Sequence, residues 1–249
     1  MLKTRPKGKE SKLYFVEPKI IFEDTNFFII DKPTGLIVND AESTKAQPTL
    51  QAWLSQKEYP LAKSREERSG IVHRLDKETS GIIIIAKTLD SFNSLQKQFK
   101  ERLVEKTYVA LVHGRLEPTK GSIEVPVGRL PWRRDRFGVL PGGRESRTDY
   151  EVISHYQKEG EEYSLVEAKP KTGRTHQIRV HFKYLGYPLV ADSFYAGRKR
   201  ARKDRTWCPR LFLHAKEISF SHPESGKRLN FSSDLAPDLK KALGLLQED

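Results

Sequence analysis

Cysteine is nearly absent from this chain of 249 residues, because Cys208 is the only one. A single cysteine excludes an intramolecular disulfide and any metal site built on several cysteines. The sequence also has no apolar stretch close to the roughly 20 residues that cross a bilayer. Its start, MLKTRPKGKESK, lacks the apolar middle region of a secretory signal. These absences favour a reducing compartment, and we predict a cytoplasmic protein that makes no contact with a membrane.

Acidic residues are too few to balance the basic ones. Lysine and arginine total 45 against 33 acidic residues, which gives a formal net charge of +12. A merely soluble basic surface would spread this charge, but two runs concentrate it, RRDR at 133–136 and RKRARKDR at 198–205. We predict that both runs are loops. Clustered positive charge in an otherwise globular composition predicts a polyanionic partner such as nucleic acid.

The predicted elements mix strands with a few helices and do not alternate regularly. Strands are predicted at 19–22, 27–30, 82–85, 107–113, 148–153, 163–168, 211–220 and 228–231, and helices at 49–57, 92–103, 175–185 and 237–246. This order indicates an α+β fold and not a doubly wound sheet. We expect residues 1–18 to form a basic, flexible arm and residues 19–249 to form a single domain.

The most informative segment is 71–88, IVHRLDKETSGIIIIAKT. A polar turn that contains Arg74 and Asp76 precedes four consecutive isoleucines, which predict a buried strand. A carboxylate held beside buried β-structure makes a rigidly placed reactive group. Carboxylates act as nucleophiles at sugar carbons, so Asp76 is a candidate nucleophile. Taken alone, the turn also allows Asp76 to be a simple turn cap.

The segment resembles the H-R-L-D-x-x-T-S-G signature of the RluA-type pseudouridine synthases, which isomerise uridines in ribosomal and transfer RNA. Other segments extend the resemblance in the same order along the chain: KPTGL at 32–36, KTYVA at 106–110, KTGRTHQIR at 171–179, LGYP at 185–188, LHA at 213–215 and HP at 222–223. One departure is Ala191-Asp192, where the family usually has Gly-Asp. The resemblance therefore covers residues 19–234 and implies a catalytic domain with a mixed, largely antiparallel sheet and flanking helices.

The resemblance also implies roles for individual residues. Asp76 would be the catalytic carboxylate, Tyr108 would pack on the flipped uracil, and Arg179 would pair with Asp76. Arg74 would fill the space that the extruded uridine leaves, since a planar guanidinium can stack there. The other predicted substrate-binding residues are His73, Arg174 and Gln177. By itself, Tyr108 in an apolar strand would be read as core and Arg179 as a surface arginine.

A metal site is the alternative that His73, His176 and His214 raise. Their spacing matches no common pattern of metal ligands. We therefore predict hydrogen-bonded structural histidines and no metal or other cofactor.

The function predicted from the sequence is that of an RNA pseudouridine synthase, with RNA as its partner. A uridine in 23S-type ribosomal RNA is favoured over one in transfer RNA, and we expect a monomer. The predicted N-terminal arm is too short for the small S4-like RNA-binding domain of many relatives. A non-catalytic RNA-binding or ribosome-assembly factor on the same fold is the alternative that composition allows equally. A glycosidase-like hydrolase is less favoured, because Asp76 has no evident second carboxylate.

Overall fold

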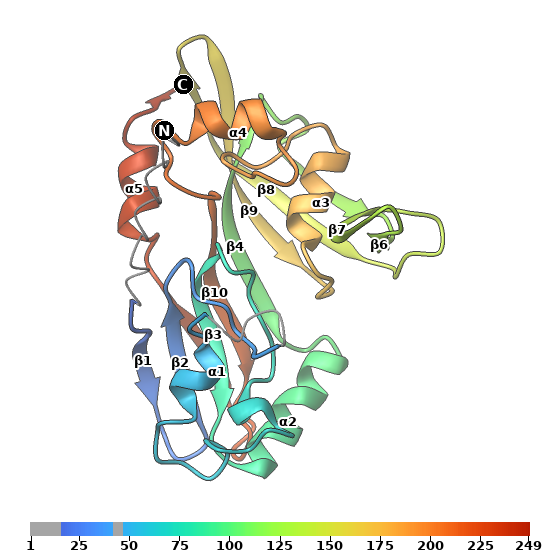
Figure 1. The fold of residues 1–249 in the computed structure, drawn as a ribbon. Helices are drawn as coiled ribbons and strands as arrows, with labels where there is room; N and C mark the ends of the chain where they lie inside the picture. Colours follow the sequence, from blue (N-terminus) through green and yellow to red (C-terminus); the bar gives the residue numbers. More distant parts are fainter. Residues whose placement is uncertain (1–15, 42–46) are drawn as a thin grey trace, which may run out of the picture.

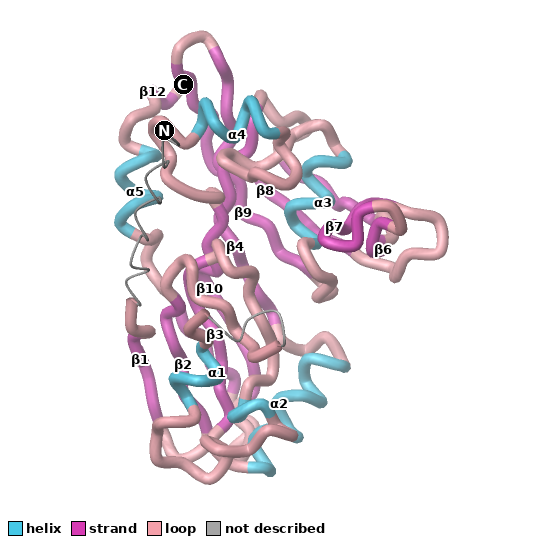
Figure 2. The backbone as a smooth tube through the Cα atoms, viewed as in Figure 1, coloured by secondary structure: helices cyan, strands magenta, loops and turns pink. Residues whose placement is uncertain are grey.

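The computed structural model describes residues 16–41 and 47–249, so the predicted arm lies almost entirely outside the described residues. Ten strands form one continuous sheet (Figures 1 and 2). Its order is β1 (Lys19–Glu23), β2 (Phe27–Lys32), β3 (Ser80–Ala86), β10 (Leu213–Ser221), β4 (Glu105–His113), β9 (Glu161–Pro170), β8 (Arg147–Lys158) and β12 (Gln247–Glu248). Strand β11 (Arg228–Ser232) pairs with β10, and β5 (Lys120–Glu124) pairs with β8.

The named strand pairs of the described chain are antiparallel except for β3 with β10. The helices flank this sheet and are α1 (Leu50–Leu54), α2 (Leu89–Lys100), α3 (Gln177–Tyr184), α4 (Arg198–Asp204) and α5 (Pro237–Leu243). A short 3-10 turn covers Arg68–Gly70. Strands β6 (Val127–Leu130) and β7 (Arg133–Val139) form a separate hairpin that projects from one side (Figure 1). The predicted α+β fold with a mixed, largely antiparallel sheet is confirmed.

The isoleucine run forms the buried strand β3 because both faces of the sheet are covered at that point. Ile83 and Ile85 face the cluster that contains α1, whereas Ile82 and Ile84 face the cluster that contains α2. Side chains alternate between the two faces of a strand, so a strand buried on both sides reads as continuously apolar. The strand thereby gives the polar turn before it a rigid base.

The sheet has two halves, and helices cover each of them. Helices α1 and α2 lie beside the half with β1, β2 and β3, while α3 and α4 lie beside the half with β8 and β9 (Figure 1). In the second half, Ile178 and Phe182 of α3 pack with Val166 and Ala168 of β9. Strands β10 and β4 join the halves in the middle. No helix in the described part of the chain is long and apolar enough to span a membrane.

Both basic runs were predicted as loops, and the structure contradicts this. The run at 198–205 forms α4, because Arg, Lys and Ala favour helices and Ala201 and Asp204 share a buried face. The run at 133–136 starts β7, where β7 pairs with β6. The end of the predicted helix at 92–103 also moves. Helix α2 stops at Lys100, and Arg102 adopts a left-handed φ of 62°.

Candidate active site

The turn with Asp76 is fixed at both of its ends. Before it, Nε2 of His73 accepts a hydrogen bond from the main-chain N–H of Ile84 at 2.9 Å, and Leu75 is buried in the core beside α1. After it, Gly81 enters β3 at a φ of +108°, where a Cβ atom would lie 2.2 Å from the carbonyl oxygen of Ala215. Only glycine fits this close approach of β3 and β10. The turn therefore cannot shift along the strand.

The Lys-Pro-Thr-Gly-Leu segment at 32–36 is hydrogen-bonded to the same turn. Lys32 is fully buried, and its ammonium group donates to the carbonyl oxygens of Pro33, Leu36 and Lys77 at 2.9, 3.0 and 3.3 Å. The main-chain N–H of Gly35 also donates to the carbonyl of Lys77 at 2.8 Å. Lys77 follows Asp76 directly. Two sequence motifs more than 40 residues apart thus form one structural unit.

Arg210 ties the turn to the C-terminal helix. Its guanidinium bonds both carboxylate oxygens of Asp238 in α5, at 2.7 and 2.9 Å. The same group donates to the carbonyl oxygen of Glu78 at 3.2 Å and to the hydroxyl of Ser80 at 2.9 Å. The hydroxyl of Ser80 also contacts Nδ1 of His214 at 2.9 Å. His214 is therefore hydrogen-bonded, as predicted.

Arg179 of α3 pairs with Asp76, as the resemblance implied and contrary to the surface position expected for Arg179 by itself. Its Nη1 lies 3.1 Å from Oδ2 of Asp76, and only 3% of Arg179 is exposed. The fully buried carboxylate of Asp192 holds the opposite edge of the guanidinium through two hydrogen bonds of 2.8 and 2.9 Å. Burial lowers the pKa of Arg179, but the bonds and charges of Asp192 and Asp76 outweigh it, so the pKa lies above its ordinary value. Arg179 is a permanent cation beside Asp76.

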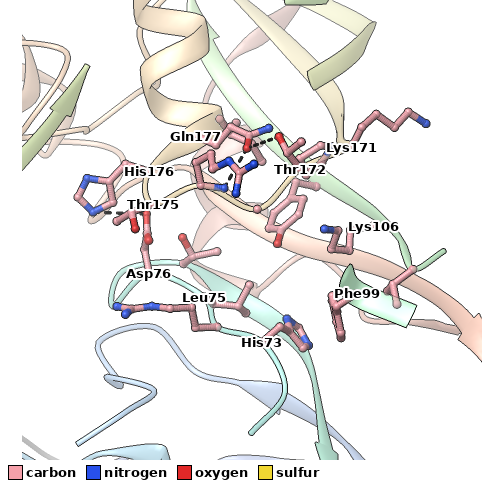
Figure 3. A pocket seen from close by; sticks show the side chains of 18 of the residues that line it. His73, Leu75, Asp76, Phe99, Lys106, Lys171, Thr172, Thr175, His176 and Gln177 are labelled. Carbon is pink, nitrogen blue, oxygen red and sulfur yellow. Dashed lines mark hydrogen bonds and ion pairs between the residues drawn. The ribbon is translucent and has the colours of Figure 1, made fainter. Parts of the chain in front are cut away.

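Lys106 and Phe99 lie across a cavity from Asp76 and His176 (Figure 3), and Tyr108 and His73 also line it. The His73 ring stacks on Phe99 with centroids 4.7 Å apart. Burial, helped by the Lys106 charge, lowers the pKa of His73 to about 3, and burial lowers the pKa of Lys106 to about 8. Burial and then the charge of Asp76 raise the pKa of Tyr108, so its phenol is neutral.

This cavity has a volume of about 520 Å³. Its size lies within the range of small-molecule sites. Among the described lining residues, lysines and arginines are numerous, whereas the carboxylate of Asp76 is the only one. The site therefore combines one anion with a strongly positive surrounding.

The remaining predicted residues have different surroundings. Arg74 lines the cavity with an exposed side chain. Gln177 is buried, and its amide bonds Thr172, Thr148 and the main chains of Arg147 and Arg174. Those bonds place Gln177 as a brace of the segment before α3. Arg174 is half-buried at the cavity, and its Nε donates to the carbonyl oxygen of Glu145 at 3.1 Å.

His176 adopts a left-handed φ of 57° directly before α3. Its Nδ1 lies 2.8 Å from the hydroxyl of Tyr195, and its Nε2 lies 3.9 Å from Oδ2 of Asp76. Burial lowers the pKa of His176, although the charge of Asp76 opposes this effect. The predicted hydrogen-bonded state of His176 is present in the structure.

Sequence reasoning missed several residues as members of the site, namely Phe99, Arg102, Lys106, Arg144 and Asp192. Asp192 carried the clearest signal, because it is an acid that ends the apolar run Pro188–Ala191 and would be costly to bury unpaired. The others come from segments whose approach to Asp76 depends on the tertiary fold.

Comparisons with known proteins show the family of the chain. A family model described as RNA pseudouridylate synthase matches residues 26–184, which is more than half of the chain. The chain belongs to this family.

Individual relatives extend the match. An uncharacterized RNA pseudouridine synthase of Chloroflexus aurantiacus is 41% identical over 88% of this chain and 66% of its own length. The ribosomal large subunit pseudouridine synthase D of Nitrosomonas europaea is 38% identical over 90% and 64%, and that of Pseudomonas aeruginosa is 35% identical over 94% and 73%. The chain thus spans about two thirds of the length of these curated relatives.

A solved structure is similar as well. The human RNA pseudouridylate synthase domain containing 1 superimposes with a TM-score of 0.71 and 26% identity, covering 94% of this chain and 89% of that one. The fold around the site is therefore a fold of this family.

Proposed function

We propose that the protein isomerises a uridine in RNA to pseudouridine, with Asp76 as the catalytic carboxylate. The observation that carries the proposal is the setting of Asp76. It is the one carboxylate among the described lining residues of the cavity, it lies 3.1 Å from the buried Arg179, and it shares the cavity with Tyr108. In this reaction the N1–C1′ bond breaks, the uracil turns, and a C5–C1′ bond forms. C5 loses a proton and N1 gains one, so no redox partner is needed.

Asp76 has three chemical roles open to it in this site. It can attack C1′, add to the uracil ring, or remove a proton from the ribose. Each role uses the carboxylate as an anion, and Arg179 holds a fixed positive charge 3.1 Å from it. Because the bidentate bond to Asp192 fixes Arg179, the cation stays in place while Asp76 reacts.

Tyr108 would act as the surface for the flipped uracil. A base inside an RNA helix hides C5 and C1′, so the nucleotide must leave the stack before the reaction. An aromatic face gives the extruded base a new stacking partner. Since the Tyr108 phenol is neutral, its hydroxyl can relay the proton that leaves C5.

Arg74 would support the RNA during extrusion. Its side chain is exposed and reaches the cavity from the turn that carries Asp76. A planar guanidinium can occupy the space left in the helix and stack there. We assign the remaining RNA grip to the basic surface, including the exposed side chains of α4: Arg198, Lys199, Arg200 and Arg202.

The proposed substrate is large-subunit ribosomal RNA, and the proposed enzyme acts as a cytoplasmic monomer. Two of the relatives above are named ribosomal large subunit pseudouridine synthase D, which favours this RNA over transfer RNA. A non-catalytic RNA-binding factor would need the basic surface but not the buried Arg179–Asp192 pair aimed at Asp76. A hydrolase of the glycosidase type would need a second carboxylate at about 5–10 Å. The cavity lining provides only Asp76 among the described residues.

Mapping of pseudouridines tests this proposal. RNA from cells that carry the gene, cells that lack it, and cells complemented with Asp76→Asn would be compared position by position. We expect at least one uridine in large-subunit ribosomal RNA to lose its modification without the gene and to stay unmodified with the variant. If every pseudouridine were present in all three strains, the proposal would be contradicted. A lost site in transfer RNA would correct the substrate alone.

A further inference from the structure

Three arginines that the proposed chemistry does not use meet at the cavity. Arg102 follows α2 in one half of the molecule, whereas Arg144 precedes β8 and Arg174 precedes α3 in the other half. Arg102 and Arg144 are exposed, and Arg174 is half-buried. The three side chains thus border the cavity from both of its sides.

None of these guanidinium groups lies within 4.0 Å of a carboxylate in residues 16–41 and 47–249. Nε of Arg174 donates to the carbonyl oxygen of Glu145, and its two terminal nitrogens are available to bind a ligand. By contrast, the nearby Arg147 pairs with Glu124 and Asp149, each at 2.9 Å. The surrounding surface therefore satisfies an ordinary arginine but leaves these three unpaired.

The three charges also act on one another. Burial lowers the pKa of Arg174, and the charges of Arg144 and Arg102 lower it further, against a smaller opposing effect of Glu145. All three guanidinium groups line the same cavity, so their positive charges repel one another. Like charges held together without a counterion cost free energy, and a bound anion would remove that cost. A built cluster of this kind selects for an anion.

We propose that Arg102, Arg144 and Arg174 together bind one backbone phosphate of the RNA, next to the nucleotide whose base enters the cavity. The choice of RNA as the ligand rests on the proposed function. Guanidinium groups match phosphate oxygens with paired, charge-assisted hydrogen bonds. A phosphate held from both sides would fix the strand relative to Asp76 without reading its sequence. The three arginines would be positioning residues for the RNA and not catalytic ones.

A second cavity offers the RNA strand a path beyond this phosphate. This second cavity, of about 320 Å³, shares Arg144 and Arg174 with the first and is also lined by residues of the β6–β7 hairpin. Gly128, Gly142 and Gly143 line it. At Gly142 a Cβ atom would meet nothing within 4 Å, so a nucleotide backbone can approach the main chain there, whereas at Gly128 and Gly143 other protein atoms fill that space. The two arginines therefore stand between two cavities, where one strand could pass through both.

Binding of a fluorescent single-stranded oligouridylate of twelve nucleotides tests the proposal. One variant, the cleft variant, carries Arg102→Gln, Arg144→Gln and Arg174→Gln. The control carries Lys227→Gln, Lys240→Gln and Lys241→Gln, three exposed lysines outside the lining of the cavity. Both variants lose three positive charges, so a difference between them reports the location and not the net charge. Circular dichroism would show that both variants are folded.

The cleft variant should bind at least about tenfold more weakly than the wild type at low salt. The slope of log K against log salt should become shallower by about 0.7, the value for one phosphate on a single strand. The control should change affinity by less than about threefold, a difference of about 0.7 kcal/mol. An unchanged slope in the cleft variant, or no binding by the wild type, would overturn the proposal. A slope change near 2 would also overturn it, because three separate phosphates would then be bound.

The assay does not measure isomerisation, so it separates the two proposals. If the pseudouridine map shows no lost site while the cleft variant behaves as expected, the proposed function fails and the phosphate site stands. If the map shows a lost site but the cleft variant binds like the control, the phosphate site fails and the proposed function stands.

Discussion

Asp192→Asn should weaken both the fold and the site, although it changes only one atom of the side chain. Asp192 is fully buried, and its Oδ1 accepts hydrogen bonds from Arg179 and from the main-chain N–H groups of Phe194 and Tyr195. Its Oδ2 accepts from Nε of Arg179 at 2.8 Å. An asparagine can keep its oxygen at the first position, where three donors converge. Its NH₂ group then faces Nε–H of Arg179, and two donors oppose each other.

The magnitude follows from the burial of the pair. Breaking one partner of a buried ion pair costs about 3–5 kcal/mol. The lower end applies here, because Arg179 retains its 3.1 Å contact with Asp76. A loss of about 3 kcal/mol is a large part of the 5–15 kcal/mol that ordinarily stabilises a domain. Arg179 would also lose its fixed orientation, and a shift of about 1 Å can slow a reaction on the order of 10²-fold.

Urea unfolding followed by circular dichroism measures the first effect, and single-turnover pseudouridine formation measures the second. Asp149→Asn is the matched control, because Asp149 is also paired with an arginine, Arg147, but at the surface. Its cost should stay below about 1 kcal/mol. If Asp192→Asn lost less than about 1 kcal/mol and kept wild-type turnover, Asp192 would have no role in holding Arg179, and the account of Arg179 as a fixed cation beside Asp76 would be refuted.

Three further predictions concern single residues. Arg74→Ala should slow single-turnover isomerisation by on the order of 10²-fold, about 2.7 kcal/mol, and this effect should be larger than its effect on RNA binding. Arg74→Lys should restore little of the rate, so full rescue by lysine would contradict the stacking role. Ala191→Gly should cost less than about 0.5 kcal/mol in a urea titration, because glycine relieves the left-handed φ of 59°; a loss above about 2 kcal/mol would show an unstrained backbone. His73 has a folded-state pKa of about 3, against its ordinary 6.5, so the unfolded chain binds more protons between these values. Its contribution to stability is complete above pH 6.5 and is lost as the pH falls towards 3, and unfolding at several pH values should show less acid sensitivity in His73→Asn than in the wild type.

Local sequence patterns predicted the elements that pack on both faces of the sheet. The isoleucine run predicted a buried strand, and β3 is buried throughout. The basic runs were wrongly predicted as loops, because charge alone does not separate a loop from an exposed strand or helix. Helix α4 forms since one of its faces is covered, and that cover comes from distant parts of the chain.

The site was predictable only in part. The pairing of Asp76 with Arg179 joins residues 103 positions apart, and the resemblance to a family predicted it where spacing could not. Asp192 was missed, because a buried acid reveals its partner only once the chain is folded. The same holds for Arg102 and Arg144, whose meeting at the cavity depends on how the two halves of the sheet are joined.

Tritium release from RNA that carries 5-³H-uridine tests the central claim most directly, with Asp76→Asn compared to the wild type. Asp90→Asn, on the exposed face of α2, is the matched control. We predict that Asp76→Asn releases tritium about 10⁴-fold more slowly or not at all, while it binds the RNA with nearly unchanged affinity and Asp90→Asn behaves as the wild type. Release by Asp76→Asn within about tenfold of the wild-type rate, a difference of only about 1.4 kcal/mol, would contradict the assignment of Asp76 as the catalytic carboxylate.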